Sequence, residues 1–121
     1  MRFRPSQRIR RHADFQEIYK TGARVHSRYC TLFIRRNQST VGRLGIAATK
    51  KLGGAVVRNR AKRLIREVFR RNKVAPGFDV VVIPKRELLD ASLITLEADY
   101  RNTLERTLRR RRTAVVAPES V

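Results

Sequence analysis

Three stretches of the chain repeat their apolar residues with the spacing of an amphipathic helix. The first, His12–Thr21, stops at Gly22, a residue type common just after a helix, and its apolar stripe consists of Phe15, Ile18 and Tyr19. The second, from Ala55 to about Arg71, is the clearest, and its core stripe consists of Val57, Ala61, Leu64, Ile65 and Val68. The third extends over residues 95–112 with Thr95 as its N-cap, and its stripe consists of Leu96, Tyr100, Leu104 and Leu108.

Three other stretches have the pattern of β-strands. In residues 24–36 one side carries Cys30, Leu32 and Ile34, and the other side carries Tyr29, Thr31, Phe33 and Arg35. In residues 43–50 the inward positions are Leu44, Ile46 and Ala48, and the small outward ones are Gly45, Ala47 and Thr49. These two stretches predict an antiparallel hairpin. Residues 78–83 are apolar on both faces, as in a central strand, and the helix before them predicts parallel pairing with the preceding strand.

The order of these elements predicts an α+β fold, with helices packed on one sheet. The chain has 121 residues, of which 41% are hydrophobic, and this is enough for one domain with one core. We expect the domain to span residues 1–112. Residues 113–121 contain Pro118 and no apolar repeat, so we expect a disordered tail there.

The net charge is the property of the composition that bears most on function. The chain has 29 Lys and Arg residues against 10 Asp and Glu, a formal net charge of +19. Such an excess opposes the compact state unless a polyanion is the partner, which makes nucleic acid the expected one. An anionic membrane surface is the second candidate, but the most basic helix uses its apolar face for the core. Arg supplies 23 of the basic residues, and Arg favours forked contacts to phosphate.

Other classes of protein are disfavoured by what the chain lacks. The longest aliphatic run, residues 80–83, is far shorter than the roughly 20 residues of a membrane helix, so we expect no membrane association. A lone cysteine, Cys30, excludes an internal disulfide framework and fits a reducing cytoplasm. The Arg-rich start could imitate a transit peptide, but a helical pattern begins almost at once.

No group of residues has the spacing of a catalytic or metal site. The two histidines, His12 and His26, lie in different elements, and Cys30 is on the inward face of its strand. The carboxylates are scattered and form none of the familiar metal-binding motifs. We therefore expect no catalytic residue and no protein-bound metal.

The densest basic segment precedes the second helix and continues along it. Arg58, Lys62 and Arg66 stand at i, i+4 and i+8, so their charged ends follow about 12 Å of one helix face and can meet several phosphates of a folded RNA. Asn59 lies among them and can both donate and accept hydrogen bonds, for example with a 2′-hydroxyl. The predicted RNA-binding residues are Lys50, Lys51, Arg58, Asn59, Arg60, Lys62, Arg63, Arg66 and Arg70.

This segment closely resembles the signature of the protein subunit of bacterial ribonuclease P, which reads Arg-Asn-Arg, one residue, Lys-Arg, two residues, Arg. The preceding Gly53, Ala55 and Val56 match its lead-in, and Asp14-Phe15-Gln16 followed by Gly22 matches an earlier family motif. The resemblance in element order covers roughly residues 9 to 112. It implies the order α-β-β-β-α-β-α, a mostly antiparallel sheet, and a left-handed βαβ crossover shared with a ribosomal protein domain. Periodicity alone would predict the common right-handed crossover.

The resemblance also implies a function. The family assists a catalytic RNA in the endonucleolytic removal of the 5′ leader from precursor tRNA. The RNA subunit is the catalyst and uses Mg²⁺, so the protein would bind this RNA and the precursor tRNA, with no small-molecule cofactor. Two other classes compete: a structural RNA-binding protein would need no cleft for a single strand, and an autonomous nuclease would need an acid cluster or a histidine pair.

A cleft between the first helix and the sheet is the second surface that the resemblance implies. It would hold the single-stranded leader, because aromatic faces stack on bases of any sequence while a basic rim holds the phosphates. The alternative is that the aromatic side chains of the first helix are simply its core stripe. The predicted cleft residues are Phe15, Tyr19, Tyr29, Phe33 and Thr49.

Overall fold

Four strands form one sheet in the order β1-β2-β4-β3. The computed structural model describes the backbone of residues 7–119 and the side chains of residues 7–107. The strands are β1 (Ala23–His26), β2 (Cys30–Arg36), β3 (Arg43–Ile46) and β4 (Phe78–Pro84). The single strand predicted over residues 24–36 is therefore two strands. The chain turns at Ser27, whose hydroxyl accepts a hydrogen bond of 3.1 Å from the backbone N–H of Cys30.

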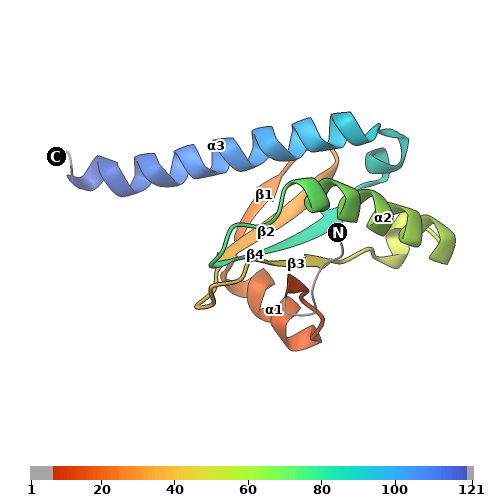
Figure 1. Ribbon diagram of the computed structural model, residues 1–121, viewed down its shortest axis with the longest axis horizontal. Coiled ribbons are helices and arrows are strands. Elements are labelled where there is room, and N and C mark those ends of the chain that lie inside the picture. The colour runs from red at the N-terminus through yellow and green to blue at the C-terminus, as the bar shows by residue number, and fades with distance from the viewer. Residues whose placement is uncertain (1–6, 120–121) are drawn as a thin grey trace.

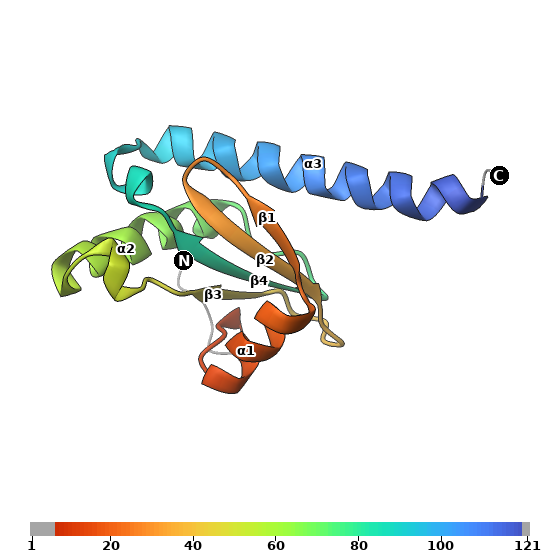
Figure 2. The same ribbon diagram turned by 180° about the vertical axis from the view of Figure 1, so that it is seen from behind.

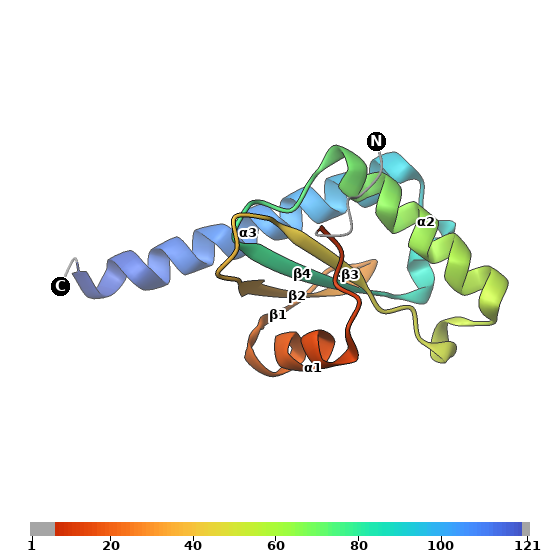
Figure 3. The ribbon, with the colours of Figure 1, turned by 60° about the horizontal axis from the view of Figure 1, so that its bottom comes forward.

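The strand pairing corrects one prediction and confirms another. β2 pairs antiparallel with β1 and with β4, whereas β3 pairs with β4 in parallel. The predicted antiparallel hairpin between residues 24–36 and 43–50 is thus wrong, because the apolar β4 lies between β2 and β3. The predicted parallel crossover is confirmed. Seen from the side of α2, with β3 and β4 pointing up, β4 lies to the left of β3. The crossover from β3 through α2 to β4 is therefore left-handed (Figures 1 and 3).

Three α-helices pack on this sheet. α1 (His12–Thr21) and α2 (Ala55–Arg71) have the predicted bounds. α3 (Leu93–Glu119) begins before Thr95, because the hydroxyl of Ser92 accepts a hydrogen bond of 3.2 Å from the Thr95 N–H. α3 also continues past residue 112, so most of the segment expected as a disordered tail is helical, and residues 120–121 lie outside the described chain. The division into a domain and a tail stays a prediction.

The helices cover the two faces of the sheet unequally (Figures 1 and 2). α2 and α3 lie on one face, over a large apolar cluster that includes Leu32, Ile34, Val80 and Val82. α1 alone lies on the opposite face, over a smaller cluster of Ile9, Ile18 and Val81. Two short 3-10 helices, η2 (Lys50–Leu52) and η3 (Arg86–Asp90), connect the elements. Among the described residues, no helix combines the length and apolar character that crossing a membrane requires.

Candidate RNA interface

A glycine turn places the basic segment at the start of α2. Gly53 has a φ of 150°, a conformation that side chains disfavour, and a Cβ there would lie 3.0 Å from the Val57 side chain. The turn joins η2, where Lys50 and Lys51 are exposed, to the first turn of α2. The predicted lysine pair and the predicted basic helix are therefore neighbours in space.

α2 presents its two faces as the sequence predicts, with one addition. Ala61, Ile65 and Val68 are buried against α3 and the sheet, and Phe69, which the predicted stripe omitted, is buried with them. The Phe69 ring lies 4.5 Å from that of Tyr100, centroid to centroid. The opposite side of the helix is exposed and carries Asn59, Arg60, Arg63, Arg66 and Arg70.

The predicted RNA-binding residues differ in whether their side chains have a hydrogen-bond or ion-pair partner within the described part of the chain. Nη2 of Arg60 donates a hydrogen bond of 3.3 Å to the carbonyl of Leu89 in η3, and Arg70 forms an ion pair of 2.8 Å with Glu67. Arg58 is half-buried, and its Nε has no hydrogen-bond partner among the described residues. No ion pair within the described part of the chain neutralises Lys62, Arg63 or Arg66. These cations are the ones that keep their charge available for a ligand.

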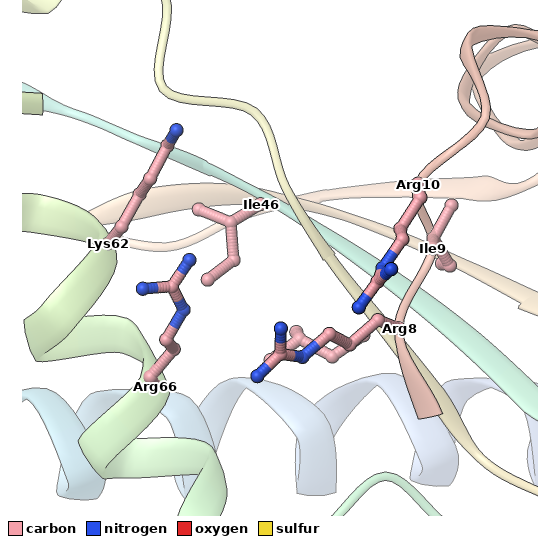
Figure 4. A pocket seen from close by; sticks show the side chains of 7 residues that line it. Arg8, Ile9, Arg10, Ile46, Lys62 and Arg66 are labelled. Atoms are coloured by element: carbon pink, nitrogen blue, oxygen red, sulfur yellow. The ribbon is translucent and has the colours of Figure 1, made fainter. Parts of the chain in front are cut away.

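Two further cations stand beside this helix, and the sequence analysis did not single them out. Arg8 and Arg10, from the segment before α1, lie close to Lys62 and Arg66 (Figure 4). The arginines of the N-terminal stretch follow no helical or strand pattern long enough to assign two of them to a surface. Only the path of the chain past β3 shows that Arg8 and Arg10 lie close to α2.

Three of the predicted cleft residues form a continuous aromatic row between α1 and β2. The ring centroids of Phe15 and Tyr19 are 6.3 Å apart, and those of Tyr19 and Phe33 are 4.9 Å apart in an edge-to-face arrangement. All three rings are half-buried. The Arg24 guanidinium lies 5.9 Å from the Phe33 centroid, and burial raises the pKa of the Tyr19 hydroxyl. The row therefore pairs partly exposed aromatic faces with a cation.

Gly45 lets the row approach the sheet. A Cβ at this position would lie 2.9 Å from Cε1 of Phe15, closer than carbon atoms pack. Gly45, one of the small outward residues predicted for this strand, thus has a physical role, because it leaves room for Phe15.

The other two predicted cleft residues are not part of this row. Tyr29 is 9% exposed and packs in the large cluster on the α2 and α3 side of the sheet, so its assignment to the cleft is corrected. The reason is the turn at Ser27, which interrupts the strand alternation that placed Tyr29 on the same side as Phe33. Thr49 is exposed between β3 and η2, and its role stays a prediction.

A buried carboxylate on the same face of the sheet was missed. Asp79 in β4 is 0% exposed and accepts two hydrogen bonds of 2.8 Å from Arg43. Arg35 and Asn37 complete its shell at 3.1 Å and 2.7 Å. Burial alone would raise the pKa of Asp79, but the hydrogen bonds from Arg43, Asn37 and Arg35 hold it below its usual value. Arg43 also lies 3.7 Å from Asp14 of α1, so the cluster ties α1 to the sheet.

The described side chains gather no group of metal ligands, since no three His, Cys, Asp or Glu residues in this part of the chain come together. Cys30 is buried, and burial raises the pKa of its thiol, which disfavours the reactive thiolate. What the arrangement offers instead is a cationic helix and a row of aromatic rings, the two features that bind the backbone and the bases of RNA.

Comparison with known proteins agrees with this chemistry. The sequence model of the family Ribonuclease P matches residues 3–108. The ribonuclease P protein component of Clostridioides difficile is 34% identical over 110 residues, which cover 88% of this chain and 96% of that protein. The corresponding protein of Thermotoga maritima is 42% identical over 88 residues, covering 71% and 75%.

Solved structures show the same likeness in three dimensions. The RNase P protein of Thermotoga maritima has a TM-score of 0.73 and 38% identity, over 82% of this chain and 96% of that one. A mutant RNase P protein of Staphylococcus aureus has a TM-score of 0.74 and 36% identity, over 84% and 88%. The chain therefore belongs to the family of bacterial ribonuclease P protein components, the protein subunits of an RNA-catalysed endoribonuclease.

Proposed function

We propose that the two surfaces divide the RNA partners between them: the basic face of α2, which includes the half-buried Arg58 and Lys62 and the exposed Arg66, binds the RNA subunit, and the aromatic row binds the single-stranded leader of precursor tRNA. Membership in the family implies association with ribonuclease P RNA. Which residues contact which RNA is the proposal.

The observation that carries the leader assignment is the half-buried state of Phe15, Tyr19 and Phe33. Fully buried rings would serve only the core, and fully exposed ones would have no fixed orientation. Rings that pack on one another at 4.9 Å and 6.3 Å and still keep exposed surface are preorganised to stack on bases. Stacking needs no particular base, which suits leaders that differ from one tRNA to the next.

The observation that supports the other assignment is the absence of counter-ions for Lys62, Arg63 and Arg66 within the described residues. Like charges at helical spacing destabilise a helix, and a folded RNA supplies the negative charge that offsets them.

We assign Mg²⁺, which the family requires, to the RNA subunit, because the described side chains form no group of metal ligands. We also assign the protein to the cytoplasm, where its buried, unpaired Cys30 would stay reduced.

The leader assignment is tested in the assembled enzyme with Phe33→Ala. We expect the variant to bind leader-bearing precursor about 1 to 3 kcal/mol more weakly, the value of one lost stack, and to bind mature tRNA with unchanged affinity. The matched control is Phe78→Ala, since Phe78 is also half-buried but packs against the large cluster on the other face. Equal losses for precursor and mature tRNA in the Phe33 variant would reject the assignment.

The basic face is tested with the triple variant Arg58→Ala, Lys62→Ala and Arg66→Ala. We expect weaker binding to the RNA subunit, with a salt dependence flatter by roughly 0.7 to 0.9 logarithmic units per lost phosphate contact. Circular dichroism should show a retained fold, because none of these side chains belongs to the large apolar cluster. A folded variant with unchanged affinity would show that this face does not bind the RNA subunit.

A further inference from the structure

A small pocket at the edge of the predicted basic face of α2 gathers four cationic side chains, and two of them, Arg8 and Arg10, lie outside the predicted sites. Arg8 and Arg10 approach it from the N-terminal segment, and Lys62 and Arg66 approach it from α2 (Figure 4). Its volume is about 190 Å³, and Ile9, Leu44 and Ile46 complete its lining. No carboxylate is among the residues that line it.

The N-terminal segment is held in place here by the sheet. The backbone N–H of Ile9 donates a hydrogen bond of 2.9 Å to the carbonyl of Leu44, and Arg8 forms a parallel bridge with the same residue of β3. Ile9 is 5% exposed and packs with Ile18 and Val81 below the sheet. In an extended segment the neighbours of an inward residue point the other way, so Arg8 and Arg10 turn towards α2. The arginines are thus positioned by a buried anchor.

No described residue forms an ion pair or a hydrogen bond with the side chain of any of the four cations. Arg35 and Arg43, by contrast, are neutralised by the buried Asp79. Cations gathered around an apolar floor repel one another, and an anion placed among them removes this repulsion.

We propose that this pocket binds a backbone phosphate of the RNA subunit, with Arg8 and Arg10 extending the basic face of α2 across β3. Phosphate is the fitting ligand, because guanidinium groups bind its oxygens through forked, charge-assisted hydrogen bonds. The RNA subunit is the source, because two of the four cations belong to the face of α2 assigned to that RNA. The inference rests on that assignment, but it concerns two residues outside it.

The test is the double variant Arg8→Gln and Arg10→Gln, compared with the control Arg36→Gln and Arg86→Gln. The control removes the same charge from exposed arginines that do not line the pocket. Binding of each purified protein to the RNA subunit is measured between low and moderate salt. We expect the pocket variant to bind about tenfold more weakly, with a slope of affinity against salt flatter by roughly 0.7 to 0.9 logarithmic units, and the control to keep the wild-type slope. Thermal melts of the two variants should agree, because the anchoring bond to Leu44 uses the backbone.

Three results would overturn the inference. One is a pocket variant with the affinity and salt slope of the control. If the triple variant of α2 still loses affinity in that case, only the phosphate pocket fails, whereas unchanged affinity in both would reject the assignment of the basic face as well. Another is a loss of affinity that is seen only when the holoenzyme binds leader-bearing precursor, while the holoenzyme binds mature tRNA normally and the protein binds the RNA subunit normally. The ligand of the pocket would then be the leader. The last is a pocket variant that melts below the control, since the arginines would then be structural.

Discussion

The two faces of the sheet are built differently, although the same strands form both. The face beneath α2 and α3 carries the large apolar cluster, in which Phe69 is 2% exposed. The face beneath α1 combines the half-buried aromatic row with the buried carboxylate of Asp79 and its arginines. One short helix covers this second face, whereas two longer helices cover the first.

This difference separates stability from binding. Side chains that are fully buried contribute to folding alone, whereas rings that keep exposed surface can also contact a ligand. Arg43 forms ion pairs with Asp79 of the sheet and with Asp14 of α1, and so it attaches α1 to the polar cluster. Apolar packing therefore need not cover the whole face. The rings of Phe15, Tyr19 and Phe33 then keep an exposed surface.

The largest expected effect comes from the face beneath α2 and α3. Phe69→Ala should lower the free energy of unfolding by about 3 to 5 kcal/mol, because it leaves a cavity among residues that cannot collapse into it. Phe33→Ala should cost clearly less, since part of that ring is already exposed. Urea denaturation of both variants measures the difference, and equal losses would remove the distinction between the faces.

The next effect comes from the polar cluster. Asp79→Asn should destabilise the fold by about 3 kcal/mol, because Arg35 loses the buried carboxylate that pairs with it and Arg43 is left with the longer contact of 3.7 Å to Asp14. Glu67→Gln, which breaks the exposed ion pair with Arg70, is the control and should cost under about 1 kcal/mol. If the two substitutions had the same effect, Asp79 would not act as a buried anchor.

Acid should act on the same cluster. The pKa of Asp79 is lower in the folded chain than in the unfolded one, so its stabilisation is present above the unfolded pKa of about 4 and is lost as the pH falls through the folded pKa. Thermal melts of the wild type between pH 6 and pH 2 should therefore show falling stability. Asp79→Asn should show a shallower decline over this range, and parallel curves for the two proteins would contradict the assignment.

The smallest effect concerns the floor of the aromatic row. Gly45→Ala should cost about 1 kcal/mol of stability, because the new methyl group displaces the Phe15 ring. It should also weaken the binding of leader-bearing precursor while leaving mature tRNA unaffected. Gly54→Ala is the control, since no atom outside its chain neighbours lies within 4 Å of a Cβ there. A Gly45 variant that binds precursor normally would show that the position of Phe15 does not matter for the leader.

Local patterns in the sequence were sufficient for much of the fold. The bounds of α1 and α2 follow from apolar spacing and from glycines at their ends, since a helix satisfies its hydrogen bonds within one segment. The alternation in β2 and β3 assigned Leu32 and Phe33 to opposite faces for the same local reason. The basic face of α2 follows from helical periodicity, and the family resemblance rests on the residues of the motif itself.

Other features depended on partners far away in the chain, and only the tertiary structure decided them. Strand order is one, because β4 comes between β2 and β3 by pairing across long stretches of sequence. The burial of Asp79 is another, since a charge enters a sheet only where arginines from two other strands meet it. The side of the sheet taken by Tyr29 depended on a turn that breaks the alternation. The place of Arg8 and Arg10 beside α2 depended on the backbone hydrogen bond from Ile9 to β3 and on the burial of the Ile9 side chain, because an extended segment acquires a position only from the surface on which it lies.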